Sequence, residues 1–379
     1  MSDNALWRLN AAGQSIWLDY IDRTILRNGD LQRRIRDEAL TGMTSNPTIF
    51  EKALAEGNEY DDQIRSAPGE HTAMDLFELI ATTDVRDACD LFQGVHKRTD
   101  GKDGFVSIEV SPAAANDAIA TISEATRLWA TVDRANCFVK VPGTAEGAKA
   151  VRQLISNGVN INITLLFSLE AYKSVIDAYM AGLEDRLAAG KDITQLHSVA
   201  SFFVSRVDTE VDKRLDAAAK AKPEKAKELN ELKGKAAIAN AKLAYKLYQE
   251  EIAGERWKRL AAKGATVQRP LWASTSTKNP SYRDVMYVEA LIGPDTVNTM
   301  PPATIDAFKD HGVVGRTVDV GVDDAQRTID ALEKNGISMH EVTDKLLVDG
   351  LASFGKSFET LIAGLQAKTK ALGKELVAR

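Results

Sequence analysis

The sequence contains few of the residues that mark disulfide-rich, metal-binding or membrane proteins. Its 379 residues include two cysteines, Cys89 and Cys137, which suits a reducing compartment and excludes a disulfide framework. The five histidines lie far apart and no HxH or HExxH pattern occurs, so no metal site is predicted. No apolar run is long enough to span a membrane, and the opening MSDNALWRLNAAGQ has no signal-peptide core. We therefore expect a cytoplasmic protein without a membrane partner.

The chain also lacks an excess of positive charge. Its net charge is −6, and no basic stripe predicts a nucleic-acid partner. With 44% hydrophobic and 27% charged residues, the composition is that of a globular protein. An anionic substrate must therefore be held by a few local cations.

Eight short segments rich in β-branched and aromatic residues predict strands, and most are joined by helical patterns. The segments are residues 15–21, 42–46, 105–110, 137–142, 159–167, 197–205, 267–275 and 295–300. Strands that alternate with helices favour a parallel sheet, and eight such units predict a (β/α)8 barrel. We expect one α/β domain over residues 1–379.

Two regions exceed a minimal barrel. Residues 207–264 include a lysine-rich run, interpreted as a solvated helical excursion with a break at Pro223. From about residue 338, apolar residues follow helical spacing to the C-terminal end, and this tail is expected to pack on the barrel. The predicted fold therefore has extra helices after the sixth strand and at the C-terminus.

Reacting groups in a parallel barrel lie at the carboxyl ends of the strands. The polar residues at those ends are Asp19, Thr44, Asn46, Glu109, Lys140, Asn162, Thr164, Ser201, Arg206, Ser274, Ser276 and Lys278. A purely structural strand has no need of such a set.

Lys140 interrupts the apolar strand CFVKVP and shares a strand face with Phe138 and Pro142. If that face is the barrel interior, desolvation disfavours the ammonium, and a neutral amine is a nucleophile that forms Schiff bases with carbonyls. The alternative is a lysine that extends from the strand end into water.

Glu109 and Asp19 are the acid–base candidates. A Schiff-base route needs proton transfers at the carbinolamine and at the hydroxyl next to the breaking C–C bond. The alternative for each carboxylate is a helix cap. Asn162 and Thr164 share one strand face and offer an amide and a hydroxyl. Asn46 either contacts a substrate or caps the helix that begins at Pro47, and both can hold.

Arg206 and Lys278 follow the sixth and seventh strands, and with Ser201 and Ser276 they suit a sugar phosphate. The alternative is that each cation forms a surface ion pair. The acids near them in sequence are Asp208, Glu210 and Asp284.

Four segments in this order resemble signature segments of transaldolases: TSNPTIF (44–50), FVKVPGT (138–144), NITLLFS (162–168) and SFFVSRVDTEVDKRL (201–215). The longer WASTSTKNPSYRDVMYVEALIGPDTVNTMPPAT (272–304) is similar to the bacterial subfamily whose chains have about this length. The resemblance covers nearly the whole sequence.

The resemblance implies a (β/α)8 class I aldolase that needs no metal and no organic cofactor. Such enzymes move a dihydroxyacetone unit from a ketose phosphate donor to an aldose phosphate acceptor. The typical pair is sedoheptulose 7-phosphate and glyceraldehyde 3-phosphate, which give erythrose 4-phosphate and fructose 6-phosphate in the non-oxidative pentose phosphate pathway. Whether the chain is a monomer or a homodimer stays open.

The resemblance also implies individual roles. Lys140 matches the Schiff-base lysine, Asp19 the acid–base aspartate, and Glu109 with Thr164 the pair that acts through a water. The matched substrate-binding residues are Asn46 and Asn162 near the dihydroxyacetone unit, and Ser201 and Arg206 at the phosphate. Lys278 and Ser276 align with a second phosphate-binding arginine and its serine in the better-known subfamily, and lysine keeps the charge but loses the bidentate geometry.

Three other functions compete with this reading. A fructose-6-phosphate aldolase of the same superfamily uses a glutamine to activate water, and no equivalent glutamine is found beside Ile163, Thr164 and Leu165. A non-catalytic sugar-phosphate-binding barrel needs neither Lys140 nor two acids. A thiol enzyme is disfavoured because Cys137 opens its strand, at the stability end of a barrel.

Overall fold

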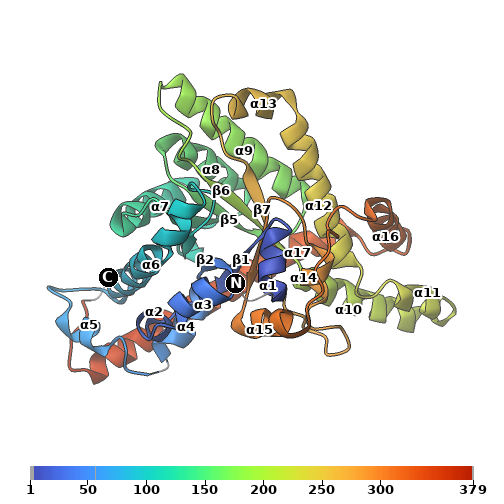
Figure 1. The fold of residues 1–379 in the computed structure, drawn as a ribbon. Coiled ribbons are helices and arrows are strands. Elements are labelled where there is room, and N and C mark those ends of the chain that lie inside the picture. Colours follow the sequence, from blue (N-terminus) through green and yellow to red (C-terminus); the bar gives the residue numbers. More distant parts are fainter. Residues whose placement is uncertain (1–3, 56, 378–379) are drawn as a thin grey trace.

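The computed structural model describes residues 4–55 and 57–377, and its centre is a closed barrel of eight parallel strands in chain order (Figure 1). The strands are β1 (Gln14–Asp19), β2 (Leu40–Thr44), β3 (Phe105–Glu109), β4 (Cys137–Pro142), β5 (Ile161–Leu166), β6 (Ser198–Phe203), β7 (Gln268–Ala273) and β8 (Thr296–Met300). The predicted barrel is confirmed. Several strands end earlier than predicted, as where β6 ends at Phe203 because Ser205 already begins a helix.

Helices surround the barrel on all sides (Figure 1). Those before β6 are α1 (Ala5–Ala11), α2 (Arg23–Arg27), α3 (Asp30–Asp37), α4 (Pro47–Ala55), α5 (Asp61–Ser66), α6 (Ala73–Arg98), η1 (Pro112–Ala114), α7 (Ala118–Val132), α8 (Ala145–Asn157) and α9 (Leu169–Ala188). Those after β6 are α10 (Ser205–Ala221), η2 (Pro223–Lys225), α11 (Ala226–Glu231), α12 (Ala236–Ala253), α13 (Glu255–Ala261), α14 (Met286–Ala290), α15 (Pro302–His311), α16 (Val322–Lys334) and α17 (Met339–Ala371). The sequence did not predict α16, because only Ala325 and Leu332 of that helix are buried.

Local sequence signals start and stop the helices that follow the strands. The Thr144 hydroxyl accepts a hydrogen bond from the Gly147 amide at 2.9 Å and caps α8, and Gly158 ends that helix with φ +95°. Asn46 caps α4 by accepting from the Ile49 amide at 3.0 Å. These caps fix each helix directly against the end of the preceding strand.

The barrel interior changes character along its axis. Near the amino ends of the strands, the rings of Phe105 and Phe138 stack at 4.3 Å between centroids, and Trp17 lies 6.0 Å from Phe138. Near the carboxyl ends, the buried side chains are polar: Thr44, Lys140, Asn162, Thr164, Ser201 and Thr299. An aromatic layer therefore lies beneath the polar groups at the carboxyl end, where a barrel carries its reactive residues.

The long C-terminal helix α17 packs against α4, α6, α10 and β5, so it lies beside the carboxyl end of the barrel (red in Figure 1). The Thr48 hydroxyl of α4 donates to Ser357 Oγ at 2.9 Å, and the rings of Phe77 and Phe358 meet edge to face at 5.5 Å. These contacts attach α17 to helices that follow β2.

Gly147 is expected to limit how closely α8 can follow β4. A Cβ at this position would lie 1.9 Å from the Pro142 carbonyl oxygen, so Gly147→Ala must displace the strand end or the helix. We expect the variant to lose about 2–4 kcal/mol of unfolding free energy, measured by urea denaturation.

Gly364→Ala is the matched control, because a Cβ at this α17 position meets no described atom within 4 Å. It should stabilise the protein by about 0.5–1 kcal/mol. Equal urea midpoints for Gly147→Ala and the unchanged protein would contradict the steric argument.

Candidate functional site

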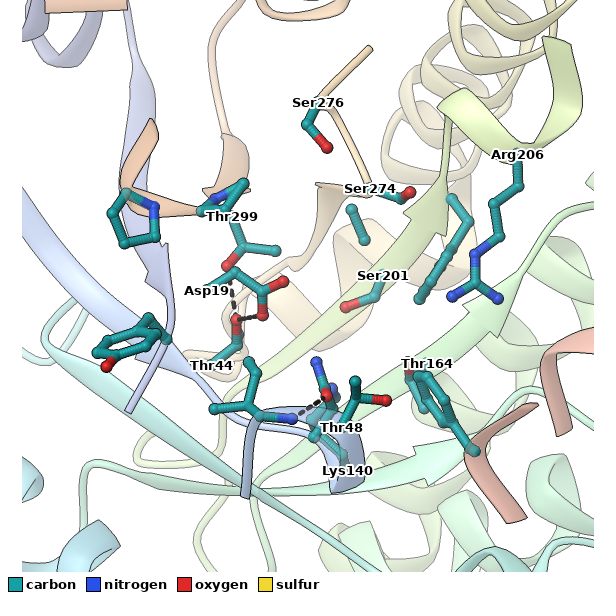
Figure 2. A pocket seen from close by; sticks show the side chains of 18 of the residues that line it. Asp19, Thr44, Thr48, Lys140, Thr164, Ser201, Arg206, Ser274, Ser276 and Thr299 are labelled. Carbon is teal, nitrogen blue, oxygen red and sulfur yellow. Dashed lines mark hydrogen bonds between the residues drawn. The ribbon is translucent and has the colours of Figure 1, made fainter. Parts of the chain in front are cut away.

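A cavity of about 430 Å³ opens at the carboxyl end of the barrel (Figure 2). Of the residues predicted from the sequence, those that line it are Asp19, Asn46, Lys140, Thr164, Ser201, Arg206, Ser276 and Lys278. Glu109 and Asn162 lie behind the lining residues, in contact with them. The strand ends therefore gather the predicted residues at one place.

Lys140 and Glu109 form a buried ion pair on neighbouring strands. They are register partners in the β3–β4 ladder, and Lys140 Nζ lies 3.0 Å from Glu109 Oε2. The same Nζ donates a hydrogen bond to the Ser45 carbonyl oxygen at 3.0 Å. The two side chains are 6% and 5% exposed, so the alternative of a lysine that extends into water is wrong. The amine is presented to the cavity with a proton acceptor already in contact.

Glu109 has an apolar environment on the side away from Lys140. A very small cavity there is walled by Phe50, Phe77 and Phe358. Burial raises the pKa of Glu109, and the charge of Lys140 opposes this shift. A carboxylate that is destabilised in this way accepts a proton from an adjacent ammonium more readily than one in water does.

Asp19 stands on the opposite wall of the cavity and is held by a chain of hydroxyls (Figure 2). Asp19 Oδ1 accepts a hydrogen bond from Thr44 Oγ1 at 2.7 Å. Thr44 Oγ1 in turn lies 2.6 Å from Thr299 Oγ1. Burial raises the pKa of Asp19, while Lys140 and the Thr44 hydroxyl pull it back. Asp19 is thus a fixed carboxyl suited to exchanging a proton within the cavity.

Asn162 orients Ser201 from beneath the cavity wall. Its Nδ2 donates to Ser107 Oγ at 3.1 Å, and its Oδ1 accepts from Ser201 Oγ at 2.7 Å. Both hydrogen bonds are buried and connect β3, β5 and β6. Direct contact between Asn162 and a substrate therefore requires Ser201 to turn aside.

Thr164 presents a buried hydroxyl next to Lys140. In the part of the chain that the structure describes, Thr164 Oγ1 has no hydrogen-bond partner. The next residue, Leu165, has φ +59°, and the β5–β6 register shifts between Ile163 and Leu166. A bulky residue in that conformation is strained, and such strain is common where a strand end must aim a side chain.

Arg206 is a cation between two aromatic rings. Its Cζ lies 5.2 Å from the ring centre of Phe203 and 5.8 Å from that of Phe354 in α17. Burial lowers the pKa of the guanidinium. The predicted alternative is wrong, because Asp208 and Glu210 bind other groups, and no acid within residues 4–55 and 57–377 pairs with Arg206.

Lys278 lies on the exposed cavity rim and donates to Ser276 Oγ at 2.8 Å. Burial of part of the side chain, and then the nearby Arg206, lower the pKa of this ammonium. Its predicted partner Asp284 instead binds His311 at 2.9 Å, so that alternative is also wrong. Among the described residues, Arg206, Lys278 and the exposed Lys52 therefore line one cavity with no ion-pair partner, which is the arrangement of an anion site.

The sequence analysis missed three kinds of contribution. Thr299 was overlooked, and Thr44 was noted at its strand end but given no role. Ser45 acts through its backbone carbonyl, which residue type does not reveal. Phe354 was recognised only as part of an apolar helical stripe, and nothing in that stripe signals which ring meets Arg206.

Metal-binding clusters and membrane-spanning helices are both absent from the residues that the structure describes. Over the ranges described, no cluster of three or more His, Cys, Asp or Glu side chains could hold a metal ion. None of the described helices is both long and apolar enough to cross a membrane.

Comparison with known proteins gives one consistent family. Residues 16–365 match the family described as "Transaldolase/Fructose-6-phosphate aldolase". The chain is 46% identical over 378 residues to a protein named transaldolase from Trichodesmium erythraeum, covering 98% of this chain and 99% of the relative. It is 49% identical over 362 residues to the transaldolase of Acidothermus cellulolyticus, with 95% of each chain covered. The transaldolase of Thermobifida fusca is 48% identical over 359 residues, 94% of this chain and 96% of its own.

Arg206→Lys should weaken binding of inorganic phosphate about 10-fold, measured by isothermal titration calorimetry. Lysine keeps the charge, but it loses the planar fork and the stacking between Phe203 and Phe354. Arg214→Lys, on the same helix but paired with Glu210 and Glu341, should bind phosphate as the unchanged protein does. Equal affinity in both variants would exclude Arg206 from the anion site.

Proposed function

Because this chain belongs to the transaldolase/fructose-6-phosphate aldolase family, we propose that it transfers a dihydroxyacetone unit between sugar phosphates through a Schiff base on Lys140. The donor is sedoheptulose 7-phosphate and the acceptor is glyceraldehyde 3-phosphate, in the cytoplasmic non-oxidative pentose phosphate pathway. The observation that carries the proposal is the buried Lys140–Glu109 pair, which opens onto a cavity that Arg206 and Lys278 also line.

The reaction begins when the Lys140 ammonium gives a proton to Glu109. The resulting amine attacks the donor's C2 carbonyl and forms a carbinolamine. Loss of water from the carbinolamine then requires a proton at its oxygen, and Glu109 in its acid form supplies it. The Thr164 hydroxyl, buried and turned to the same cavity, can align the water that relays these protons. The product is an iminium that joins Lys140 to the sugar.

Asp19 then acts at the bond that breaks. Its carboxylate accepts the proton of the hydroxyl at C4, the electrons of the C3–C4 bond move into the iminium, and the aldose phosphate leaves. The remaining dihydroxyacetone stays on Lys140 as an enamine. The acceptor aldehyde enters, the enamine carbon attacks it, and Asp19 returns the proton to the new hydroxyl.

One anion site can serve both half-reactions. The ketose and aldose phosphates each carry their phosphate at the end remote from the reacting carbon, so Arg206 and Lys278 hold either one. Ser201 and Ser276 add hydroxyls beside these cations. The distance from this site to Lys140 then selects the length of the sugar.

Fructose-6-phosphate aldolase activity, with release of free dihydroxyacetone, is the alternative. It requires water to protonate the enamine before the acceptor arrives. No glutamine occurs among the described residues that line the cavity, and Phe203 and Phe354 occupy the wall beside Arg206. These apolar rings limit the water on the Arg206 side of the cavity, which favours transfer.

Borohydride reduction in the presence of fructose 6-phosphate should leave a dihydroxyacetone adduct on Lys140, identified by mass spectrometry of proteolytic peptides. The reason is that borohydride reduces an iminium to a stable amine. Lys140→Arg should form no adduct and should retain less than roughly one thousandth of the turnover, because guanidinium is not nucleophilic at neutral pH.

Lys52→Arg is the matched control, because Lys52 also lines the cavity but lies at its exposed rim. It should keep the adduct on Lys140. An adduct on another lysine in an active enzyme would overturn the proposal. Free dihydroxyacetone at the same rate with and without erythrose 4-phosphate would instead favour the aldolase alternative.

The acid limb of the kcat/KM–pH profile should lie above the ordinary aspartate value of 3.8, because burial raises the pKa of Asp19 and the reaction needs its carboxylate. Activity is therefore lost as the pH falls through this raised value. Thr44→Val removes a hydrogen bond that lowers the pKa of Asp19, so the acid limb should move to higher pH.

Thr41→Val serves as the control for this shift. Thr41 lies on the same strand as Thr44, but its hydroxyl donates to the Ile16 carbonyl and not to Asp19. Its acid limb should coincide with that of the unchanged enzyme. A limb that stays in place in Thr44→Val would assign the titration to another group.

A further inference from the structure

Helix α10 carries two aspartates one turn apart, and each joins the same two parts of the chain. Asp208 accepts from the Ala237 amide at 2.8 Å and from the Tyr287 hydroxyl at 2.9 Å. Asp208 is 1% exposed, and burial raises its pKa to about 6, so it is mainly ionised at neutral pH. Each of its carboxylate oxygens has one protein donor.

Asp212 repeats the pattern one turn further along α10. It accepts from the Gly234 amide at 3.0 Å and from the Tyr282 hydroxyl at 2.6 Å. Gly234 has φ +69°, and a Cβ there would lie 2.8 Å from Tyr282 Cζ. The tyrosine ring therefore lies directly against the backbone of Gly234, in a space that no other residue type leaves open.

The backbone donors belong to the start of α12, within the helical excursion. The N-cap residue of α12, Lys235, provides no side-chain cap, and Asp208 instead binds the free Ala237 amide in the first turn. Asp212 binds the amide of Gly234, in the turn just before the N-cap. Negative charge at a helix N-terminus is also favourable electrostatically. Two carboxylates thus attach the start of α12 to α10.

The tyrosine donors belong to the connection between β7 and β8, which also carries Ser276 and Lys278. The inner end of this connection is fixed where Thr275 Oγ1 donates to Asn298 Oδ1 at 2.8 Å. The intervening residues 278–281 are exposed. Beyond them, Tyr282 binds Asp212, Arg283 donates to Glu289 and to the His311 carbonyl, and the exposed Asp284–His311 pair is a weak anchor. Of these contacts, only that of Tyr282 reaches the helix that carries Arg206.

We propose that Tyr282 and Asp212 are positioning residues that hold the Lys278 loop at a fixed distance from Arg206, and that this is the function of the α10–α12 excursion. The inference rests on the proposed anion site. Arg206 lies in the first turn of α10, so one rigid helix bears Arg206 at its start and the loop's anchor further along. The spacing of the two cations is then set by the Tyr282 hydroxyl and not by the exposed residues 278–281 alone.

The decisive variant is Tyr282→Phe, which removes one hydroxyl and leaves the ring against Gly234. Calorimetric titration with inorganic phosphate should show affinity about 3- to 10-fold weaker than that of the unchanged protein. The KM for erythrose 4-phosphate should rise by a similar factor while kcat with saturating substrate changes little. With fructose 6-phosphate saturating as donor, turnover with unphosphorylated erythrose as acceptor should be unaffected, which a general loss of structure would not produce.

Two further variants test the same contact independently. Asp212→Ala should weaken phosphate binding as Tyr282→Phe does, and the double variant should be no worse than Asp212→Ala alone, because both remove one hydrogen bond. Gly234→Ala pushes the ring away and should act in the same direction. Melting temperatures identify any variant that is lost to unfolding, and the conservative Tyr282→Phe then decides the question.

Tyr179→Phe is the matched control. It removes a hydroxyl that donates to the Thr266 carbonyl at 2.8 Å, near the amino end of β7 and away from the cavity. It should bind phosphate normally. Normal phosphate affinity in Tyr282→Phe, or an equal loss with phosphorylated and unphosphorylated acceptors, would overturn the inference. Unchanged protein that fails to bind phosphate would overturn the anion site as well, while borohydride trapping on Lys140 would still report on the Schiff base separately.

Discussion

The ion pair between Lys140 and Glu109 constrains everything at the carboxyl end of the barrel. Two charges taken out of water are costly unless they are paired and hydrogen-bonded, and here they are register partners on adjacent strands with the Ser45 carbonyl as a third member. Removing either charge would leave the other buried and uncompensated. The pair is therefore poorly explained by stability alone, and better explained by a reaction in which the proton between amine and carboxylate must move.

This constraint also explains why the barrel is divided along its axis. Phe138 and Lys140 occupy the same face of β4, but one lies in the stacked aromatic layer with Phe105 and the other in the polar layer with Glu109. The apolar layer supplies rigidity, because aromatic packing fixes the strands that carry the reactive groups. The polar layer can then hold raised carboxyl pKa values at Asp19 and Glu109 without loosening the fold.

The sequence predicted the barrel and the place of Lys140 because strand and helix periodicities are local signals. It left the partners of Arg206 open, and the reason is geometric. Asp208 is two residues away on α10, which rotates its side chain by roughly 200° and turns it towards α12 and Tyr287. Asp208 is therefore close to Arg206 in the sequence, but its side chain points away from Arg206 in the structure. Phe354 contacts Arg206 from α17, near the C-terminal end of the sequence, and the helical spacing of apolar residues does not predict that contact.

The helices outside the barrel support the proposed anion site, which lies beyond the ends of the strands. Strand ends position an amine and two carboxyls, but an anion held at the rim needs support from outside the barrel. Helix α10 provides it by carrying Arg206 at one end and the Asp212 anchor further along, while α17 approaches closely enough at Gly350 that a Cβ would lie 3.5 Å from Arg206 Nη1. In the proposed reaction, binding energy gained at the remote phosphate aligns the sugar carbons against Lys140, so the same arrangement would make a barrel chemistry selective for phosphorylated substrates.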